Sequence, residues 1–275
     1  MTRSFKVTRM ILVLLVLSII GLTWYGPIPQ WDSYHAFADA RTFDDHRNML
    51  NVWSNFAFTG AAFLGLVHYV FLSGELSGYP EVYDDPRRGN ISLIIFILGV
   101  LGTAAGSSYY HANPTDETLV YDRLPMTICF AALYAEFLGE YVSWSVGRFA
   151  LWALLFFGVG SVYYWQEFDD LRPYALVQFF PLVTIPIIAA MVGFENRSLK
   201  EGIRYLISPS EKSTRLWRNT LLLYLLAKIF EHFDAEIFAW GNVVSGHTLK
   251  HIASGIACYM AILAMVHCRR PKWFT

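Results

Sequence analysis

The chain has 275 residues, of which 55% are hydrophobic and 16% are charged, and its formal net charge is −1. Soluble domains carry about 25% charged residues, so this composition excludes an ordinary soluble domain. The near-zero net charge gives no basis for nucleic-acid binding. The three cysteines lie in or beside apolar runs, and an odd number without paired spacing indicates buried thiols rather than a disulfide framework. We therefore predict a polytopic membrane protein.

The N-terminus has two interpretations. Residues 1–9 carry three basic side chains and precede an uncharged run over residues 10–25. A cleaved signal peptide has a similar basic start and apolar core. No small-x-small cleavage motif follows, because the chain continues as Gly-Pro-Ile-Pro over residues 26–29. We therefore favour a retained transmembrane helix within residues 1–27, ahead of the main domain over residues 28–275, and cleavage is the alternative.

Seven further apolar segments follow a polar, acidic stretch between Trp31 and Met49. Each has roughly the 20 residues that a membrane-spanning helix needs, and prolines and glycines separate them. The predicted spans are residues 51–73, 91–111, 122–143, 148–165, 174–193, 217–240 and 246–267. The expected fold is all-α, with a seven-helix core bundle plus one extra N-terminal transmembrane helix.

Eight spans would place both termini on the same side of the membrane. Basic residues concentrate at the termini and in the segment from Glu195 to Arg218, as the positive-inside rule predicts for cytoplasmic segments. We therefore expect cytoplasmic termini, in a bacterial inner membrane or in the ER or Golgi. The end of span 91–111 and the starts of spans 122–143 and 246–267 then lie near the non-cytoplasmic face.

Polar side chains repeat at a spacing of four in two of these apolar segments. Ser107 and His111 form one pair and His247 and His251 the other, and residues four apart share a helix face. A catalytic zinc ion takes three protein ligands and leaves a fourth position to water. We predict that the three histidines bind zinc near the non-cytoplasmic face. Asp122 would orient the water or move its proton, and Ser107 would hydrogen-bond the water or the developing oxyanion.

Each of these residues also has a plainer interpretation. A histidine in an apolar helix is usually a satisfied core residue. Ser107 could hydrogen-bond to a carbonyl one turn earlier, and Asp122 could cap the helix that it begins. The combination at one membrane depth favours the metal site.

The Ser-x-x-x-His pair, an aspartate eleven residues after that histidine and a final-helix His-x-x-x-His resemble the alkaline ceramidase family. That family belongs to a superfamily of seven-helix membrane hydrolases that includes the adiponectin receptors. Asn51, Ser54 and Asn55 also resemble the asparagine-rich opening of its first core helix. The resemblance covers about residues 30–267. It implies catalytic zinc on the three histidines, assistance from Asp122 and Ser107, and hydrolysis of ceramide to a sphingoid base and a fatty acid.

The segment before the first core helix departs from the family pattern. Eukaryotic alkaline ceramidases carry an acidic calcium site there, with an Asp-Trp-x-Glu-like pattern, whereas residues 31–39 of this chain contain no glutamate. Oxygen ligands for a calcium ion could come from Asp32, Asp39, Asp44 and Asp45. The same residues could form a solvated loop, or Asp39 could pair with Arg41. His35 could instead lie over the mouth of the site.

A second polar cluster contains Lys228, Glu231 and Asp234, with Lys250 between the two zinc-type histidines. Pairing of Lys250 with Glu231 or Asp234 would satisfy both charges and is the preferred interpretation. Alternatively, Lys250 supports the ligands or binds substrate, because charges inside membranes often serve function. Residues that could surround and support the zinc ligands are His35, Asn55, Glu231, Asp234 and Lys250.

The leading hypothesis is a zinc-dependent membrane amidohydrolase with a ceramide-like lipid as substrate, without nucleic acid and without an obligate protein partner. A second hypothesis is a lipid hydrolase of other specificity, either phospholipase-like or acting on other N-acyl lipids, because the same centre cleaves esters. A third is a receptor-type protein with structural zinc. The open fourth ligand position argues against the third hypothesis, because structural sites normally use four protein ligands.

Overall fold

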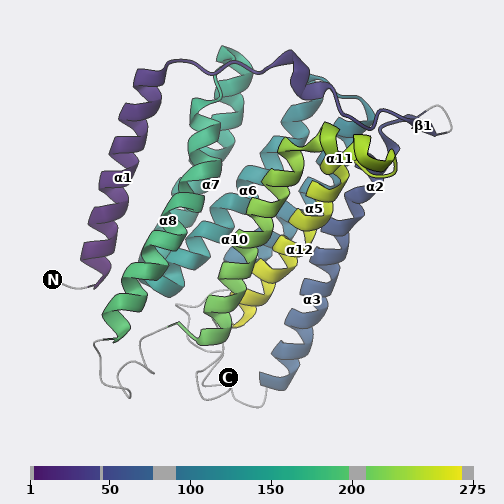
Figure 1. Ribbon diagram of the computed structural model, residues 1–275. Helices are drawn as coiled ribbons and strands as arrows, with labels where there is room; N and C mark the ends of the chain where they lie inside the picture. The colour runs from purple at the N-terminus through teal and green to yellow at the C-terminus, as the bar shows by residue number, and fades with distance from the viewer. Residues whose placement is uncertain (1–2, 44–45, 77–90, 198–208, 268–275) are drawn as a thin grey trace.

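The computed structural model describes residues 3–43, 46–76, 91–197 and 209–267, and within them eight long helices run side by side (Figure 1). The long helices are α1 (Arg3–Tyr25), α3 (Phe56–Leu76), α5 (Ile91–Ala112), α6 (Asp116–Tyr141), α7 (Trp144–Phe168), α8 (Arg172–Arg197), α10 (Glu211–His232) and α12 (Gly246–His267). The short elements are η1 (Asp32–His35), β1 (Thr42–Phe43), β2 (His46–Arg47), α2 (Met49–Ser54) and α11 (Asp234–Gly241). The start of α1 and the end of α12 lie at the same end of the bundle.

The all-α prediction is confirmed, because the described residues contain no sheet beyond the two-residue pair β1–β2. Six helical stretches are long and apolar enough to cross a membrane, namely α1, α2–α3, α5, α7, α8 and α12. Helices α6 and α10 carry more polar and charged side chains and do not meet that criterion. A core of seven membrane spans plus one N-terminal span therefore stays a prediction. The assignment to the membrane protein class rests on the six apolar stretches.

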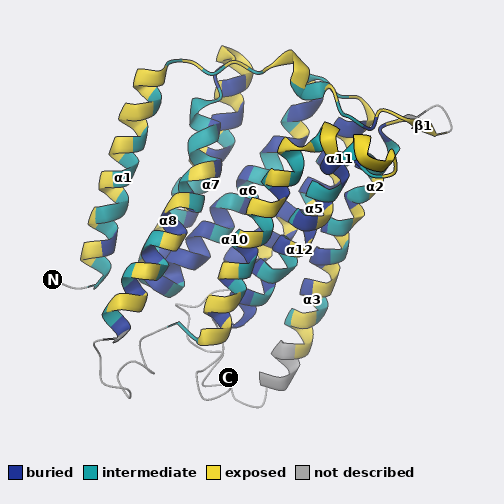
Figure 2. Cartoon of the chain, viewed as in Figure 1, coloured by how far each residue is buried: buried dark blue, intermediate teal, exposed yellow. Residues whose placement is uncertain are grey.

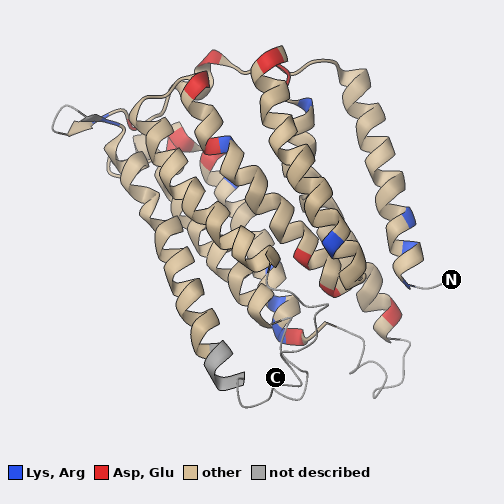
Figure 3. Cartoon of the chain, turned by 180° about the vertical axis from the view of Figure 1, so that it is seen from behind, with Lys and Arg blue, Asp and Glu red and all other residues tan. Residues whose placement is uncertain are grey.

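Apolar side chains cover the outside of the bundle. Exposed positions follow the outer faces of the long helices (Figure 2), and many of them are large hydrophobic residues. Long stretches of the helices carry neither acidic nor basic residues (Figure 3). Such a surface is unfavourable in water and favourable against lipid, which agrees with the membrane assignment.

Helix α1 lies at the edge of the bundle, and its main partner is α8. Its first turns are joined to the end of α8 by ion pairs from Arg3 and Lys6 to Glu195, with N–O distances of 3.2 and 3.1 Å. Only 6% of its apolar window is buried. Helix α1 therefore contributes one buried side chain, Val7, to the hydrophobic core and otherwise lies on the outside of the bundle.

Three predicted boundaries are wrong. Helix α6 begins at Asp116 because Thr115 and Thr118 form a capping box, so Asp122 lies in the second turn and does not cap the helix. The predicted first core span is interrupted at Asn55, which separates α2 from α3. The predicted span over 217–240 divides at Phe233 into α10 and α11.

Two glycines allow the helices around the polar end to approach closely. A Cβ added at Gly106 in α5 would collide with the backbone carbonyl oxygen of Tyr121 in α6. A Cβ added at Gly246, the first residue of α12, would collide with the carbonyl oxygen of Phe230 in α10. Glycine is therefore required at both contacts, and each brings a predicted site residue next to a neighbouring helix.

Candidate metal centre

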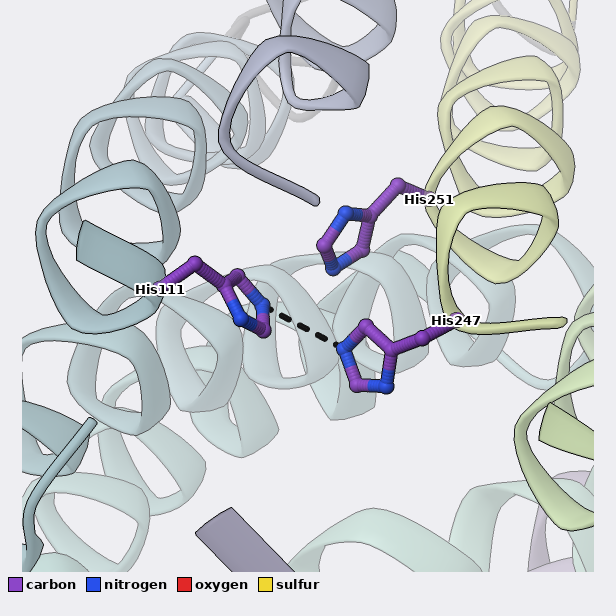
Figure 4. Close-up of side chains that lie close together, drawn as sticks. All are labelled: His111, His247 and His251. Carbon is purple, nitrogen blue, oxygen red and sulfur yellow. Dashed lines mark hydrogen bonds between the residues drawn. The ribbon is translucent and has the colours of Figure 1, made fainter. Parts of the chain in front are cut away.

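The last turn of α5 and the first two turns of α12 bring three histidine side chains together. His111, His247 and His251 are 1%, 5% and 2% exposed, and their rings point toward a shared space (Figure 4). One ring nitrogen from each lies within 4.8 Å of the others. Among the described residues, this is the one group of three or more histidine, cysteine or acidic side chains close enough to hold a metal ion.

The spacing of the histidines fits a tetrahedral ion. The Nε2 atoms of His111 and His247 are 3.3 Å apart. Ligands at about 2.0–2.1 Å from a tetrahedral zinc ion lie roughly 3.3–3.4 Å from one another. Three imidazoles buried together in an apolar bundle also require strong interactions to offset their desolvation. The residues present therefore fit a zinc-type site.

Hydrogen bonds select the tautomer of His251. Its Nδ1 lies 3.1 Å from the backbone oxygen of Asn51 and 2.7 Å from the Oγ of Ser54. A carbonyl oxygen can only accept, and Ser54 itself donates to the same oxygen at 2.9 Å. Nδ1 must therefore carry the proton, which leaves the Nε2 lone pair of His251 free for a metal.

Asp234 fixes the first turn of α12 through the backbone. Its Oδ1 accepts from the backbone N–H of His247 at 2.6 Å, and its Oδ2 accepts from the N–H of Ala38 at 3.0 Å. The Oγ of Ser245 accepts from the N–H of Thr248 at 3.2 Å and caps the same turn. Asp234, predicted as a supporting residue, therefore acts on the position of the helix end and not on an imidazole.

Asp122 and Ser107 lie beside the triad, on facing sides of the α5–α6 contact. The Ser107 side chain lies next to the carboxylate of Asp122, and both residues are buried. The Oδ1 of Asp122 has no hydrogen-bond partner within the described structure. An orphaned carboxylate oxygen in a buried position needs a donor, and a substrate or a water at the triad would supply one.

A cavity extends from this polar end between α5, α6, α8, α10 and α12. Its polar end contains Ser107, Asp122, Lys250 and His251, and most of the remaining wall is aliphatic or aromatic. Along α6 the wall runs from Asp122 to Leu133, which is about 16 Å at the helical rise per residue. The site thus has one polar end and a long apolar interior.

The segment before β1 crosses the triad. The ring of Phe37 packs edge-on against His111 and His247, with centroids 4.6 Å from each. His35 does not cover the histidines; its ring nitrogens lie 3.0 Å from the Tyr110 hydroxyl and 3.2 Å from Asp116. The residue over the triad is therefore Phe37, and His35 anchors the segment beside it.

The buried carboxylate of Asp39 is paired with the guanidinium of Arg41. This guanidinium donates to both oxygens of Asp39 at 2.7 Å and also to the carbonyls of Asn242 and Val243. The pairing holds the pKa of Asp39 below its usual range. Asp39 is thus engaged in the predicted Arg41 pair, Asp32 lies in η1, and Asp44 and Asp45 lie outside the described residues. No group including Asp32 or Asp39 meets the metal-site geometry among the described residues.

The ion pair predicted between Lys250 and Glu231 is present, with an N–O distance of 2.6 Å. Glu231 also pairs with Lys228 at 2.6 Å. The Nζ of Lys250 lies 3.5 Å from the Nε2 of His247, so Lys250 adjoins the triad. Asn55 is buried and donates to the carbonyl of Asn51 at 2.9 Å. The same carbonyl contacts His251, so Asn55 is linked to the histidines through Asn51.

Two residues of the site take roles that the sequence did not predict. Phe37 is an aromatic residue in a loop and has no pattern that predicts contact with a histidine cluster. Asn51 acts through its backbone carbonyl, which every residue type has. The asparagine-rich opening of the first core helix was the available signal for Asn51, although not for the atom that it uses.

Comparison with known proteins agrees with these features. The model of the protein family described as Ceramidase matches residues 47–272, which include all three histidines, Ser107 and Asp122. A search of curated proteins gives no match. The matched range begins just before α2, so α1 and the segment that contains Phe37 lie outside it.

Proposed function

Because this chain belongs to the ceramidase family, whose hydrolases act on the amide bond of ceramide, we propose that it is a zinc-dependent amidohydrolase that releases a sphingoid base and a fatty acid. The observation that carries the proposal is a group of three buried histidines, of which His251 lines the polar end of an apolar cavity together with Asp122 and Ser107. The metal ligands would be His111, His247 and His251. Zinc held by three imidazoles polarises a carbonyl and lowers the pKa of water at the open position toward about 7.

Asp122 supplies the proton transfers in this mechanism. Its unpartnered Oδ1 would take a proton from the attacking water and return it to the nitrogen of the leaving amine. The Ser107 hydroxyl lies next to this carboxylate and would help to keep it oriented toward the cavity. Proton transfer by a positioned carboxylate contributes about 10²–10⁴-fold to rate, which sets the loss expected on removing it.

The chain's own packing would position the amide and limit access of water. Phe37 covers the outer side of His111 and His247, and the cavity behind them is lined mainly by apolar side chains. An alkyl chain extends roughly 1.3 Å per methylene by standard C–C geometry, so about 16 Å of wall along α6 matches about twelve methylenes. A long-chain N-acyl lipid would place its chain there and its amide at the histidines.

The test combines metal analysis with a hydrolysis assay on purified full-length protein. Wild type should bind one zinc per chain and release fatty acid from ceramide. His111→Ala should lose both, whereas His68→Ala, an exposed histidine on α3 beside Tyr259, should retain both. Asp122→Asn should keep the zinc and lose turnover by about 10²-fold or more. Full turnover by His111→Ala would refute the metal mechanism.

The orientation in the membrane belongs to the same proposal. The triad lies at the end of the bundle opposite the start of α1, and the basic residues Arg3, Lys6 and Arg9 favour a cytoplasmic N-terminus. The active site would then lie near the non-cytoplasmic face. A membrane-impermeant thiol reagent should label a cysteine placed at exposed Trp240 in α11 in intact cells, and labelling only after permeabilisation would reverse the orientation.

A further inference from the structure

Two lysines and one glutamate form a chain of ion pairs beside the triad. Glu231 accepts from Lys228 at Oε2 and from Lys250 at Oε1, each at 2.6 Å. The three side chains are only 31%, 20% and 15% exposed for Lys228, Glu231 and Lys250. Both lysines line the cavity that also contains Asp122 and His251. The metal mechanism uses neither ammonium.

The ammonium groups of Lys228 and Lys250 have more N–H donors than the hydrogen bonds described for them use. Each ammonium has three N–H groups, and Glu231 takes one from each lysine. Within the described part of the chain, the other hydrogen-bond contact of Lys250 is the Nε2 of His247 at 3.5 Å, a nitrogen that a metal would occupy. Lys228 lies 5.8 Å from the centroid of the Phe179 ring. Partly buried ammonium donors that line an apolar cavity are costly unless an acceptor enters.

Once a metal is bound, the positive charges at the polar end of the cavity outnumber the negative charges that the protein supplies there. Lys228 and Lys250 share one carboxylate, Glu231. Asp122 also lines the cavity and interacts electrostatically with Lys250, although within the described residues it forms no ion pair with either lysine. A divalent ion on the three neutral histidines would add two further positive charges. The polar end of the cavity is therefore suited to an anion.

We propose that Lys228 and Lys250 form a carboxylate-binding subsite that holds a free long-chain fatty acid, with its alkyl chain in the apolar cavity. This inference rests on the proposed function, because amide hydrolysis at the triad would produce that acid next to Lys250. A carboxylate offers two acceptor oxygens and one negative charge, which match two ammonium groups with unused donors. The amine product is cationic at neutral pH and is repelled by the same lysines, so the subsite separates the two products.

Ligand binding to the full-length, zinc-loaded protein in detergent tests this subsite without turnover. Isothermal titration with hexadecanoic acid, hexadecanol and hexadecylamine varies the headgroup at constant chain length. We expect the acid to bind about tenfold or more tighter than the alcohol, in line with a hydrogen bond to a charged group, and the amine to bind most weakly. Equal affinities for acid and alcohol would overturn the subsite.

A variant pair separates the lysines from the metal, which also attracts carboxylates. In Lys228→Met, Glu231 keeps its pair with Lys250, so the substitution removes one cation from the cavity without leaving a buried charge alone. At equal zinc content, we expect acid affinity to fall about tenfold while alcohol affinity is unchanged, and Lys228→Arg to retain the preference. An unchanged acid preference in Lys228→Met refutes the proposal.

The two proposals fail in different ways. A protein that prefers the acid but does not hydrolyse ceramide would support the subsite and contradict the proposed function. An active ceramidase that binds acid and alcohol alike would do the reverse. If Lys228→Met does not purify as a folded protein, Lys228→Gln at equal zinc content replaces it in the same titrations, and an unchanged acid preference in that variant refutes the subsite.

Discussion

Ser54→Ala tests whether the partners of His251 tune the metal centre. The Oγ of Ser54 lies 2.7 Å from Nδ1 of His251, and the backbone oxygen of Asn51 lies 3.1 Å from the same atom. Removing a group that orients a metal-bound histidine typically costs 10–100-fold in metal affinity. Because Asn51 remains as a partner, we expect the lower end, about tenfold, which equals about 1.4 kcal/mol.

Competition with a chromogenic chelator measures the zinc Kd of the purified variant. Ser108→Ala is the matched control, because Ser108 lies next to Ser107 in α5 but its hydroxyl donates to the carbonyl of Val52 at 3.3 Å. The zinc Kd of Ser108→Ala should stay within about twofold of wild type. If Ser54→Ala has the same zinc Kd as wild type, then Ser54 does not support His251 as a metal ligand.

Three further predictions concern packing, access and pH. Gly106→Ala should destabilise the protein by about 1–3 kcal/mol or more, because the added Cβ would collide with the α6 backbone. Gly60→Ala is the control, because a Cβ there meets nothing within 4 Å, and it should not lower the thermal unfolding midpoint. Equal unfolding midpoints for the two variants would contradict this reasoning. Phe37→Ala should speed zinc loss to a chelator several-fold in stopped-flow, since the ring covers two of the histidines, and an unchanged rate would show that Phe37 is not a barrier. The Arg41 guanidinium lowers the pKa of Asp39, so this carboxylate stabilises the fold above its unfolded pKa of about 3.9 and loses the effect as the pH falls through the lower folded value. Asp39→Asn should therefore lower the unfolding midpoint at pH 7 and differ less from wild type as the pH falls below about 4; a difference that is constant with pH would refute that reasoning.

Apolar runs predicted the helices that are apolar over their whole length. The spans predicted over 91–111 and 246–267 correspond to α5 at Ile91–Ala112 and α12 at Gly246–His267. The start of α6 was missed because its first turn is acidic and polar, and a capping box rather than hydrophobicity determines where it begins. The break at Phe233 was missed because the residues on both sides still favour a helix.

The candidate site was predictable where side-chain type and spacing determine it. His111, His247 and His251 converge because four-residue spacing places each pair on one face and the topology brings the helix ends to one side of the bundle. Contacts through backbone atoms, such as the Asn51 carbonyl on His251, have no sequence signature. The position of Phe37 depends on the path of a loop, which periodicity does not determine.

The short helix α2 explains how histidines from two separate helices keep one geometry. At its start, the Nδ2 of Asn48 donates to the carbonyl of His111 at the end of α5, at 3.1 Å. On the other side, Asn51 accepts from Thr248 of α12 through its Oδ1 at 2.8 Å, and its carbonyl and Ser54 hold His251. A continuous first core helix would direct these groups along one axis, whereas the break at Asn55 lets α2 contact both α5 and α12. The asparagine-rich opening of the first core helix therefore connects the end of α5, which carries His111, to the start of α12, which carries His247 and His251. Its side chains contribute to the site without being ligands.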